Sequence, residues 1–202
     1  MASIYDLKPA FQGRLRPLVV QLAARGVTAN QVTIAALLLS IAAGALVALW
    51  PEAALPLLLL PVALFVRMAL NAIDGMLARE HNQKSRLGAL LNEIGDVLSD
   101  AALYLPLATA PGVPSWPVIL AAILAATAEL TGVLGLTIGA SRRYDGPMGK
   151  SDRAVVFGAL ALWLGFGLPT GLWIDALLWL VVLLLLVTLW NRARRALRDG
   201  SR

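Results

Sequence analysis

Apolar residues fill six long stretches of this 202-residue chain, and this pattern constrains the fold more than any other feature of the sequence. Hydrophobic residues make up 59% of the chain, and the mean hydropathy is +0.76. A single soluble core of this size buries far fewer apolar side chains. We therefore predict an all-α integral membrane protein with six transmembrane helices. The expected spans are approximately 32–49, 53–77, 88–110, 116–138, 154–168 and 171–190.

The sequence indicates one domain over residues 1–202. We expect a cytoplasmic amphipathic segment at 1–27, a six-helix core at 28–190 and a basic cytoplasmic tail at 191–202. In the first segment, apolar residues recur three or four apart between basic residues. This spacing is typical of a juxtamembrane helix that lies on the membrane surface.

Local signals refine the beginning of the chain. Pro9 and Pro17 predict that the amphipathic helix, at residues 4–22, bends or restarts. Thr28 followed by Gln31 has the capping-box pattern, so a helix is expected to start there. The first residues form no continuous apolar region before a small-residue cleavage site, so we expect no cleaved signal peptide.

Basic residues are concentrated on alternate connections of the expected bundle. Every one of the 17 lysines and arginines except Arg67 falls there: Lys8, Arg14, Arg16, Arg25; Arg79, Lys84, Arg86; Arg142, Arg143, Lys150, Arg153; and Arg192, Arg194, Arg195, Arg198, Arg202. The positive-inside rule then places both termini and the polar segment 81–86 on the cytoplasmic side of a cell (inner) membrane. A nucleic-acid surface is not favoured, because nothing resembles a soluble binding module.

Polar side chains interrupt the apolar pattern in two neighbouring helices. Asn71 and Asp74 lie on one helical face, and Asn92 and Asp96 lie on one face of the next helix. A short polar connection makes these helices antiparallel, so the two faces oppose each other. Carboxylate and amide oxygens, in a chain without cysteine and with one histidine, suit Mg²⁺ or Mn²⁺. We therefore predict an active site here.

Arg67 and Asp100 are expected to form a structural ion pair. They lie at similar distances before and after the polar connection, so a rise of about 1.5 Å per residue brings them to the same depth. An isolated charge at that depth is costly. Glu129 is the competing partner for Arg67.

The polar stretch resembles the signature of the CDP-alcohol phosphotransferases, which include phosphatidylglycerolphosphate, phosphatidylinositol-phosphate and phosphatidylserine synthases. That signature is D-x-x-D-G-x-x-A-R, eight or nine residues, then G-x-x-x-D-x-x-x-D. Six of its eight fixed positions match with the spacing intact: Asp74, Gly75, Ala78, Arg79, Gly88 and Asp96. Asn71 and Asn92 stand at the first and third aspartate positions.

The resemblance implies transfer of a phosphatidyl group from CDP-diacylglycerol to an alcohol, with release of CMP. It implies that Asp74 and Asp96, with Asn71 and Asn92, hold Mg²⁺ or Mn²⁺, and that Asp96 is the catalytic base. The implied nucleotide and pyrophosphate pocket comprises Gly75, Ala78, Arg79 and Gly88, with a weaker match at Asn30 and Thr33. A homodimer is also expected, because family members form homodimers.

The two asparagines remove two negative charges from the implied metal site, which leaves several outcomes open. In the first outcome, Asp74 and Asp96 suffice for one metal ion or two weakly held ions. In the second, Asp100 assists them. In the third, the chain is a catalytically silent member that binds a CDP-lipid as a sensor or partner subunit. A transporter is less favoured, because no polar stripe continues to the external side.

Basic residues crowd the last cytoplasmic connection. Arg142, Arg143 and Lys150 are expected to hold a phosphate of the acceptor or of the lipid donor, while simple topological anchoring is the alternative reading. A phosphorylated acceptor such as glycerol 3-phosphate is slightly preferred. Gly146, Pro147 and Gly149 predict a turn that folds back toward the site.

Overall fold

A computed structural model describes residues 4–200, and within this range the chain forms helices and connections but no strand. The α-helices are α1 (Ile4–Ala24), α2 (Ala29–Leu49), α3 (Ala54–Glu80), α4 (Arg86–Tyr104), α5 (Ser115–Leu134), α6 (Lys150–Gly165) and α7 (Leu172–Asp199). Two 3₁₀ helices, η1 (Leu105–Thr109) and η2 (Gly135–Ile138), continue α4 and α5. The all-α prediction is confirmed for the part of the chain that the structure describes.

Four segments are long and apolar enough to cross a membrane: α2, α3, α5 with η2, and α7. Helix α6 has 16 residues, fewer than the roughly 20 that a perpendicular crossing needs. Helix α4 has 19 residues but carries Glu93, Asp96 and Asp100. The sequence-based count of six membrane-spanning helices therefore stays a prediction.

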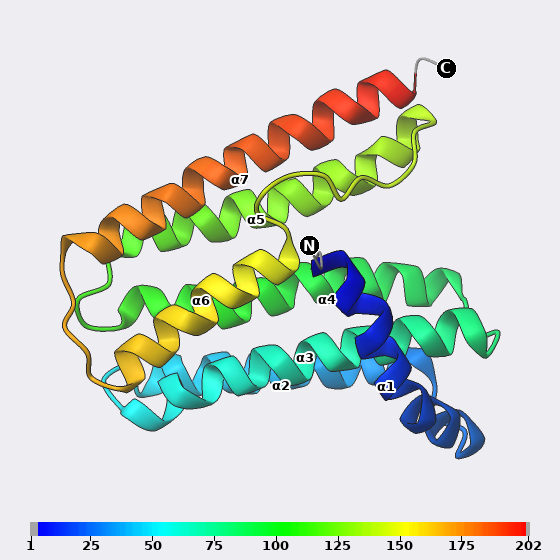
Figure 1. Cartoon of the computed structure of the whole chain (residues 1–202), viewed down its shortest axis with the longest axis horizontal. Helices are drawn as coiled ribbons and strands as arrows, with labels where there is room; N and C mark the ends of the chain where they lie inside the picture. Colours follow the sequence, from blue (N-terminus) through cyan, green and yellow to red (C-terminus); the bar gives the residue numbers. More distant parts are fainter. Residues whose placement is uncertain (1–3, 201–202) are drawn as a thin grey trace.

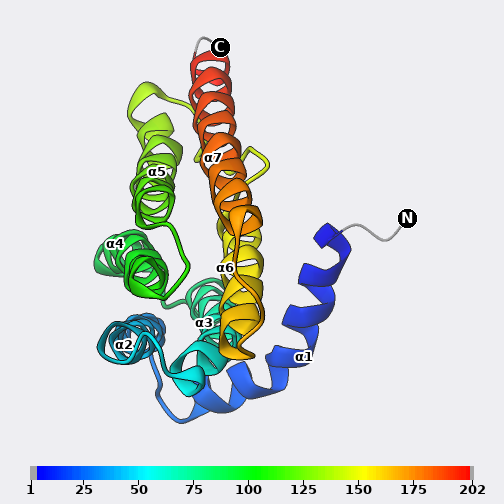
Figure 2. The same cartoon turned by 90° about the vertical axis from the view of Figure 1, so that its left-hand side faces the viewer.

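Helices α2–α7 form three tiers of two (Figure 1). In the end-on view the tiers are α5 with α7, α4 with α6, and α2 with α3 (Figure 2). Direct contacts run α7 to α5, α5 to α4, α4 to α2, α2 to α3, and α3 to α6. Residues far apart in the sequence consequently face the same interior.

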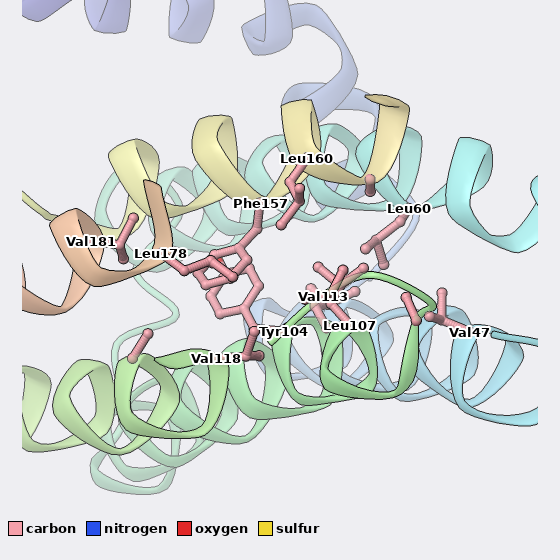
Figure 3. Packing of buried hydrophobic residues seen from close by; sticks show 14 of the residues in the cluster. Val47, Leu60, Tyr104, Leu107, Val113, Val118, Phe157, Leu160, Leu178 and Val181 are labelled. Carbon is pink, nitrogen blue, oxygen red and sulfur yellow. The ribbon is translucent and has the colours of Figure 1, made fainter. Parts of the chain in front are cut away.

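Apolar side chains fill one part of this interior and cover the outside of the bundle. The rings of Tyr104 and Phe157 stack with centroids 4.3 Å apart, and α5 and α7 add Val118 and Leu178 (Figure 3). Large apolar side chains are also exposed on every core helix, among them Leu38, Leu55, Leu90, Trp116, Val155 and Leu183. An apolar exterior of this extent fits a lipid environment and not water.

Helix α1 lies apart from the tiers and packs on α3 (Figure 2). Phe11 meets Phe65 edge-on with centroids 6.1 Å apart, and Arg16 forms an ion pair with Glu80 at 2.9 Å. The helix runs without interruption through Pro9 and Pro17, so the predicted restart does not occur. Its position on a membrane surface stays a prediction.

Several helix ends follow the capping residues in the sequence. The capping box predicted at Thr28 and Gln31 is confirmed. Helix α6 begins at Lys150 and not at residue 154, because the Asp152 carboxylate accepts a hydrogen bond from the Gly149 N–H at 2.9 Å. Helix α7 continues to Asp199, beyond the predicted end at residue 190, so most of the basic tail is helical.

The connection between η2 and α6, residues 139–149, folds back along α5 and α7 (Figure 1). The Arg143 N–H donates to the Gly132 carbonyl at 3.0 Å, and the Met148 N–H donates to Thr188 Oγ1 at 3.0 Å. Gly146 has a φ of +126°, and a Cβ there would lie 2.6 Å from Thr188 Cα. Only glycine fits this passage, which delivers Lys150 to the centre of the bundle.

Candidate active site

Antiparallel helices α3 and α4 bring the two polar faces together. The Asn71 amide nitrogen donates to Asp96 Oδ1 at 3.0 Å. One turn deeper on α3, the Arg67 guanidinium donates to the Asp96 carbonyl oxygen at 3.1 Å. Asp74 and Asp96 are 5% and 7% exposed, so both carboxylates lie inside the protein and not toward lipid.

Helix α2 closes one side of this site. Thr33 Oγ1 donates to Asp74 Oδ2 at 2.7 Å. A Cβ on Gly88 would lie 2.7 Å from Asn30 Oδ1, so the start of α2 approaches the start of α4 closely. Gln83 fixes this approach, because its side-chain oxygen accepts from the Ala29 N–H at 2.6 Å and its nitrogen donates to the Val27 carbonyl at 3.3 Å.

The remaining signature residues lie along the last turns of α3. The Arg79 guanidinium folds back over Gly75, where a Cβ would lie 3.1 Å from both terminal nitrogens. Ala78 is half-buried, whereas Arg79 is exposed. The structure therefore gathers Asn30, Thr33, Gly75, Arg79 and Gly88 at the end of the bundle that holds the α3–α4 connection.

Both carboxylate oxygens of Asp96 already have partners. Oδ1 accepts from Asn71 and lies 3.3 Å from Arg67 Nη2, and Oδ2 pairs with the Lys150 ammonium. Lys150 enters from the first turn of α6. Its side chain is 29% exposed, so the cluster reaches the surface on this side.

The donor set suits a hard divalent cation by its chemistry. It offers the carboxylates of Asp74 and Asp96 and the amide oxygens of Asn71 and Asn92, and two carboxylates balance the charge of one such ion. Among the side chains that the structure describes, no three histidine, cysteine or acidic residues are grouped to hold a metal ion. By its chemistry alone the donor set suits one divalent cation, and an ion at Asp96 would compete with the Lys150 ammonium.

A buried charge network continues inward from Asp96. Arg67 Nη1 lies 2.7 Å from Asp100 Oδ1, and Arg153 Nη2 lies 2.6 Å from Asp100 Oδ2. Glu129, the alternative partner considered for Arg67, pairs instead with Arg153 at 3.1 Å and Arg192 at 3.4 Å. Each charge has an opposite charge nearby, as burial requires.

Arg153 and Arg192 are site-adjacent residues that the sequence reading assigned to a connection and a tail. Their exposed fractions are 0% and 2%. The sequence could have predicted further buried cations near Asp100 and Glu129. Two acidic residues lie inside the expected spans with a single arginine, Arg67, to pair with them, so further basic residues were needed. The first turn of α6 supplies Arg153, and the extension of α7 supplies Arg192.

The three basic residues expected to bind phosphate separate into two groups. Arg142 pairs with Glu93, lies 4.8 Å from the centre of the Tyr144 ring, and shares Glu129 Oε2 with Lys150. Arg142 Nη2 is buried without a hydrogen-bond partner. Arg143 instead pairs with Asp145 at 2.8 Å and with Asp199, on the side of α7.

Asp145 fastens the connection to α7. It accepts from Arg143 and pairs with Arg195, and its carbonyl oxygen accepts from Arg192 Nε at 3.3 Å. Partial burial raises the pKa of Asp145, but the hydrogen bonds from Arg143 and Arg195 outweigh it and hold the pKa below its ordinary value. Asp145 therefore stays ionised at neutral pH.

Comparisons with known proteins agree with the signature. The profile of the CDP-alcohol phosphatidyltransferase family matches residues 26–191. The inner membrane protein YnbA of Escherichia coli (strain K12) is 49% identical over 196 residues, which cover 96% of each chain. This relationship and the apolar helices identify the chain as a multi-pass membrane protein.

Two solved structures of Mycobacterium tuberculosis phosphatidylinositol phosphate synthase share the fold. The structure with CDP-DAG bound has a TM-score of 0.72 at 19% identity, and the match covers 91% of this chain and 92% of that one. The complex with manganese and citrate has a TM-score of 0.71 at 20% identity, with coverages of 90% and 88%.

Proposed function

The chain belongs to the CDP-alcohol phosphatidyltransferase family, and we propose from this premise that it transfers a phosphatidyl group from CDP-diacylglycerol to an alcohol, releasing CMP. The observation that carries the proposal is the contact between Asn71 and Asp96 across α3 and α4. It joins the two halves of the signature at one partly buried point. A related fold with CDP-DAG bound supports a CDP-lipid as donor.

Asp96 is the base in the proposed reaction. Its carboxylate takes the proton of the acceptor hydroxyl, and the oxygen attacks the phosphorus that carries the diacylglycerol. The bond from that phosphorus to the oxygen bridging to CMP breaks, and CMP leaves. Arg67, Asn71 and Lys150 orient the Asp96 carboxylate.

Asp74, Asp96, Asn71 and Asn92 are the proposed metal ligands, and Thr33 orients Asp74. When bound, Mg²⁺ or Mn²⁺ would neutralise negative charge on the pyrophosphate. The manganese complex of a related fold supports this choice of metal class. Asp100 pairs with Arg67 at 2.7 Å and with Arg153 at 2.6 Å, and it is not among the proposed ligands.

The end of the bundle beside the α3–α4 connection is the proposed nucleotide and pyrophosphate site. Gly75, Ala78 and Gly88 leave room for the ligand, and Arg79 supplies a positive charge beside Gly75. Asn30 borders Gly88 from α2. Arg142 and Lys150, which lie 3.8 and 3.9 Å from Glu129 Oε2, are proposed to bind a phosphate of the lipid donor.

The membrane arrangement is also part of the proposal. Six helices, α2–α7, cross the cell membrane with both termini and the site on the cytoplasmic side, because basic residues mark those connections. Helix α1 lies on the cytoplasmic leaflet, and two copies of the chain form a homodimer.

A catalytically silent CDP-lipid sensor is the second candidate. The amides of Asn71 and Asn92 favour it, because they weaken the attraction for a metal ion. Purified protein in detergent, supplied with CDP-diacylglycerol, Mn²⁺ and a panel of alcohols, separates the two functions. Mass spectrometry should detect CMP and a new phosphatidyl-alcohol; saturable CDP-lipid binding without either product would establish the sensor instead.

A further inference from the structure

Four basic side chains converge on the carboxylate of Glu129. Arg153 and Arg192 lie 3.1 and 3.4 Å from Oε1, while Arg142 and Lys150 lie 3.8 and 3.9 Å from Oε2. The Glu129 side chain is 5% exposed. A carboxylate of the protein thus occupies a position to which four cations would otherwise attract an external anion.

This position adjoins the proposed base. The Lys150 ammonium contacts Asp96 and Glu129 together, so the two carboxylates are separated by a single cation. An acceptor hydroxyl must approach Asp96 to give up its proton. A phosphate attached to that acceptor would therefore fall within reach of the cations around Glu129.

The basic and acidic side chains of the network nearly balance, so little net positive charge remains to bind such a phosphate. Its basic members are Arg67, Arg142, Lys150, Arg153 and Arg192, and its acidic members are Glu93, Asp96, Asp100 and Glu129. The surplus among these side chains is one positive charge, with Asp74 and the proposed metal ion left out of the count. Without Glu129 the surplus would be two, which matches the charge of about −2 on a phosphate monoester near pH 7.

The donors of the two innermost arginines are also engaged. Arg192 Nη1 donates to the Ala128 carbonyl at 2.6 Å, and Arg153 Nη1 donates to the Met148 carbonyl at 3.2 Å. Both side chains are closed off from solvent. A phosphate would have to displace Glu129 and leave that carboxylate buried without partners, which is costly.

We infer that Glu129 is a specificity-determining residue and that the acceptor is an uncharged alcohol. The inference rests on the proposed function and names its acceptor class. It departs from the sequence-based preference for a phosphorylated acceptor, because the number of basic residues in the connection does not reveal their internal carboxylate partners. The Glu129 carboxylate provides the specificity, because its negative charge disfavours binding of a phosphorylated acceptor.

The test compares matched acceptors on the unaltered protein. CMP release from CDP-diacylglycerol is measured with glycerol against glycerol 3-phosphate, and with inositol against inositol phosphate. We expect kcat/KM to favour the uncharged member of the productive pair by at least about tenfold. A preference for the phosphorylated member overturns the inference and leaves the proposed function intact, whereas no CMP release with any acceptor overturns both.

A variant tests the role of Glu129 itself. Glu129→Gln keeps the shape of the side chain and removes its charge, so the kcat/KM ratio should move toward the phosphorylated acceptor by about tenfold or more. Calorimetry should then detect glycerol 3-phosphate binding that the unaltered protein lacks. Glu52→Gln, on an exposed connection, is the matched control. If Glu129→Gln folds and its kcat/KM ratio for the two acceptors is unchanged, Glu129 does not determine specificity. If this variant does not fold, the kcat/KM ratio of the unaltered protein decides whether the acceptor is uncharged.

Discussion

Asn71 and Asn92 set the charge of the proposed metal site. The first and third aspartate positions of the family signature carry neutral amides here, so only Asp74 and Asp96 remain as carboxylates. Asn71 also donates to Asp96, a contact that an ionised aspartate at this position cannot make. The amide thus orients the base while weakening the attraction for a cation.

Restoring both aspartates should strengthen metal binding. In the variant Asn71→Asp with Asn92→Asp, two added carboxylates attract Mn²⁺, and its affinity should rise by at least about tenfold. Isothermal titration of Mn²⁺ into the purified protein measures the change. Gln21→Glu, on the exposed face of α1, adds a charge away from the site and serves as control. An unchanged Mn²⁺ affinity would argue that these positions are not ligands.

Arg67 is predicted to matter for stability because its partners cannot reach water. Arg67→Leu leaves Asp96 and Asp100 each with one cation fewer. The free energy of unfolding should fall by about 3–5 kcal/mol, as found when one member of a buried pair is removed. Unfolding in mixed detergent measures it. Arg16→Leu breaks a pair that is 57% and 39% exposed, so it should cost at most about 1 kcal/mol; equal effects of the two changes would refute the argument.

Helix α2 and helix α4 approach each other at Gly44. A Cβ there would lie 1.8 Å from the Ala102 carbonyl oxygen, so Gly44→Ala must push the two helices apart. Gly13→Ala in α1 meets no atom within 4 Å. The same substitution should therefore destabilise the protein at residue 44, and at residue 13 stabilise it by about 1 kcal/mol through helix propensity. Thermal unfolding measures the change in stability for both variants, and a stabilised Gly44→Ala protein would contradict the close approach of α2 and α4 at this residue.

The folded-back connection should loosen when Asp145 is neutralised. Asp145→Asn removes the ion pairs to Arg143 and Arg195, so hydrogen-exchange protection of residues 140–149 should fall at pH 7. In the unaltered protein, the pKa of Asp145 is lower in the folded state than in the unfolded state. The stabilisation from its ion pairs is therefore present above about pH 4, the pKa of the unfolded state, and it is lost only as the pH falls through the folded-state pKa. Protection corrected for intrinsic exchange should stay constant from pH 5 to pH 8. A loss within that window would show that another group holds the connection.

Single elements differ in how well the sequence predicted them. Thr28 marked the start of α2 correctly, because capping depends on residues close in sequence. Helix α6 begins four residues before the apolar span predicted at 154–168, because Asp152 caps the helix in the polar stretch that precedes this span. A turn that folds back was predicted at Gly146, Pro147 and Gly149, but the course of the connection along α5 and α7 depends on Thr188 and Arg192, which lie far along the chain.

At the scale of the whole molecule, composition predicted the all-α membrane class, and the spacing of Asp74 and Asp96 predicted that α3 and α4 face each other. Periodicity within a helix and short connections determine both features. The pairing of α6 with α4 in one tier could not be predicted from periodicity or from connection lengths, and neither could the network around Glu129. Both arise from long-range packing, for which one sequence supplies no direct signal.

The most direct test of the account is CMP release from CDP-diacylglycerol by purified protein with Mn²⁺ and an alcohol acceptor, comparing Asp96→Asn with Asp175→Asn. Asp175 lies in the first turn of α7, at the opposite end of the bundle. Asp96→Asn should lower turnover about 10²–10⁴-fold, as expected for loss of a general base, while Asp175→Asn should leave it unchanged. Full turnover by a folded Asp96→Asn protein would contradict an active site between α3 and α4.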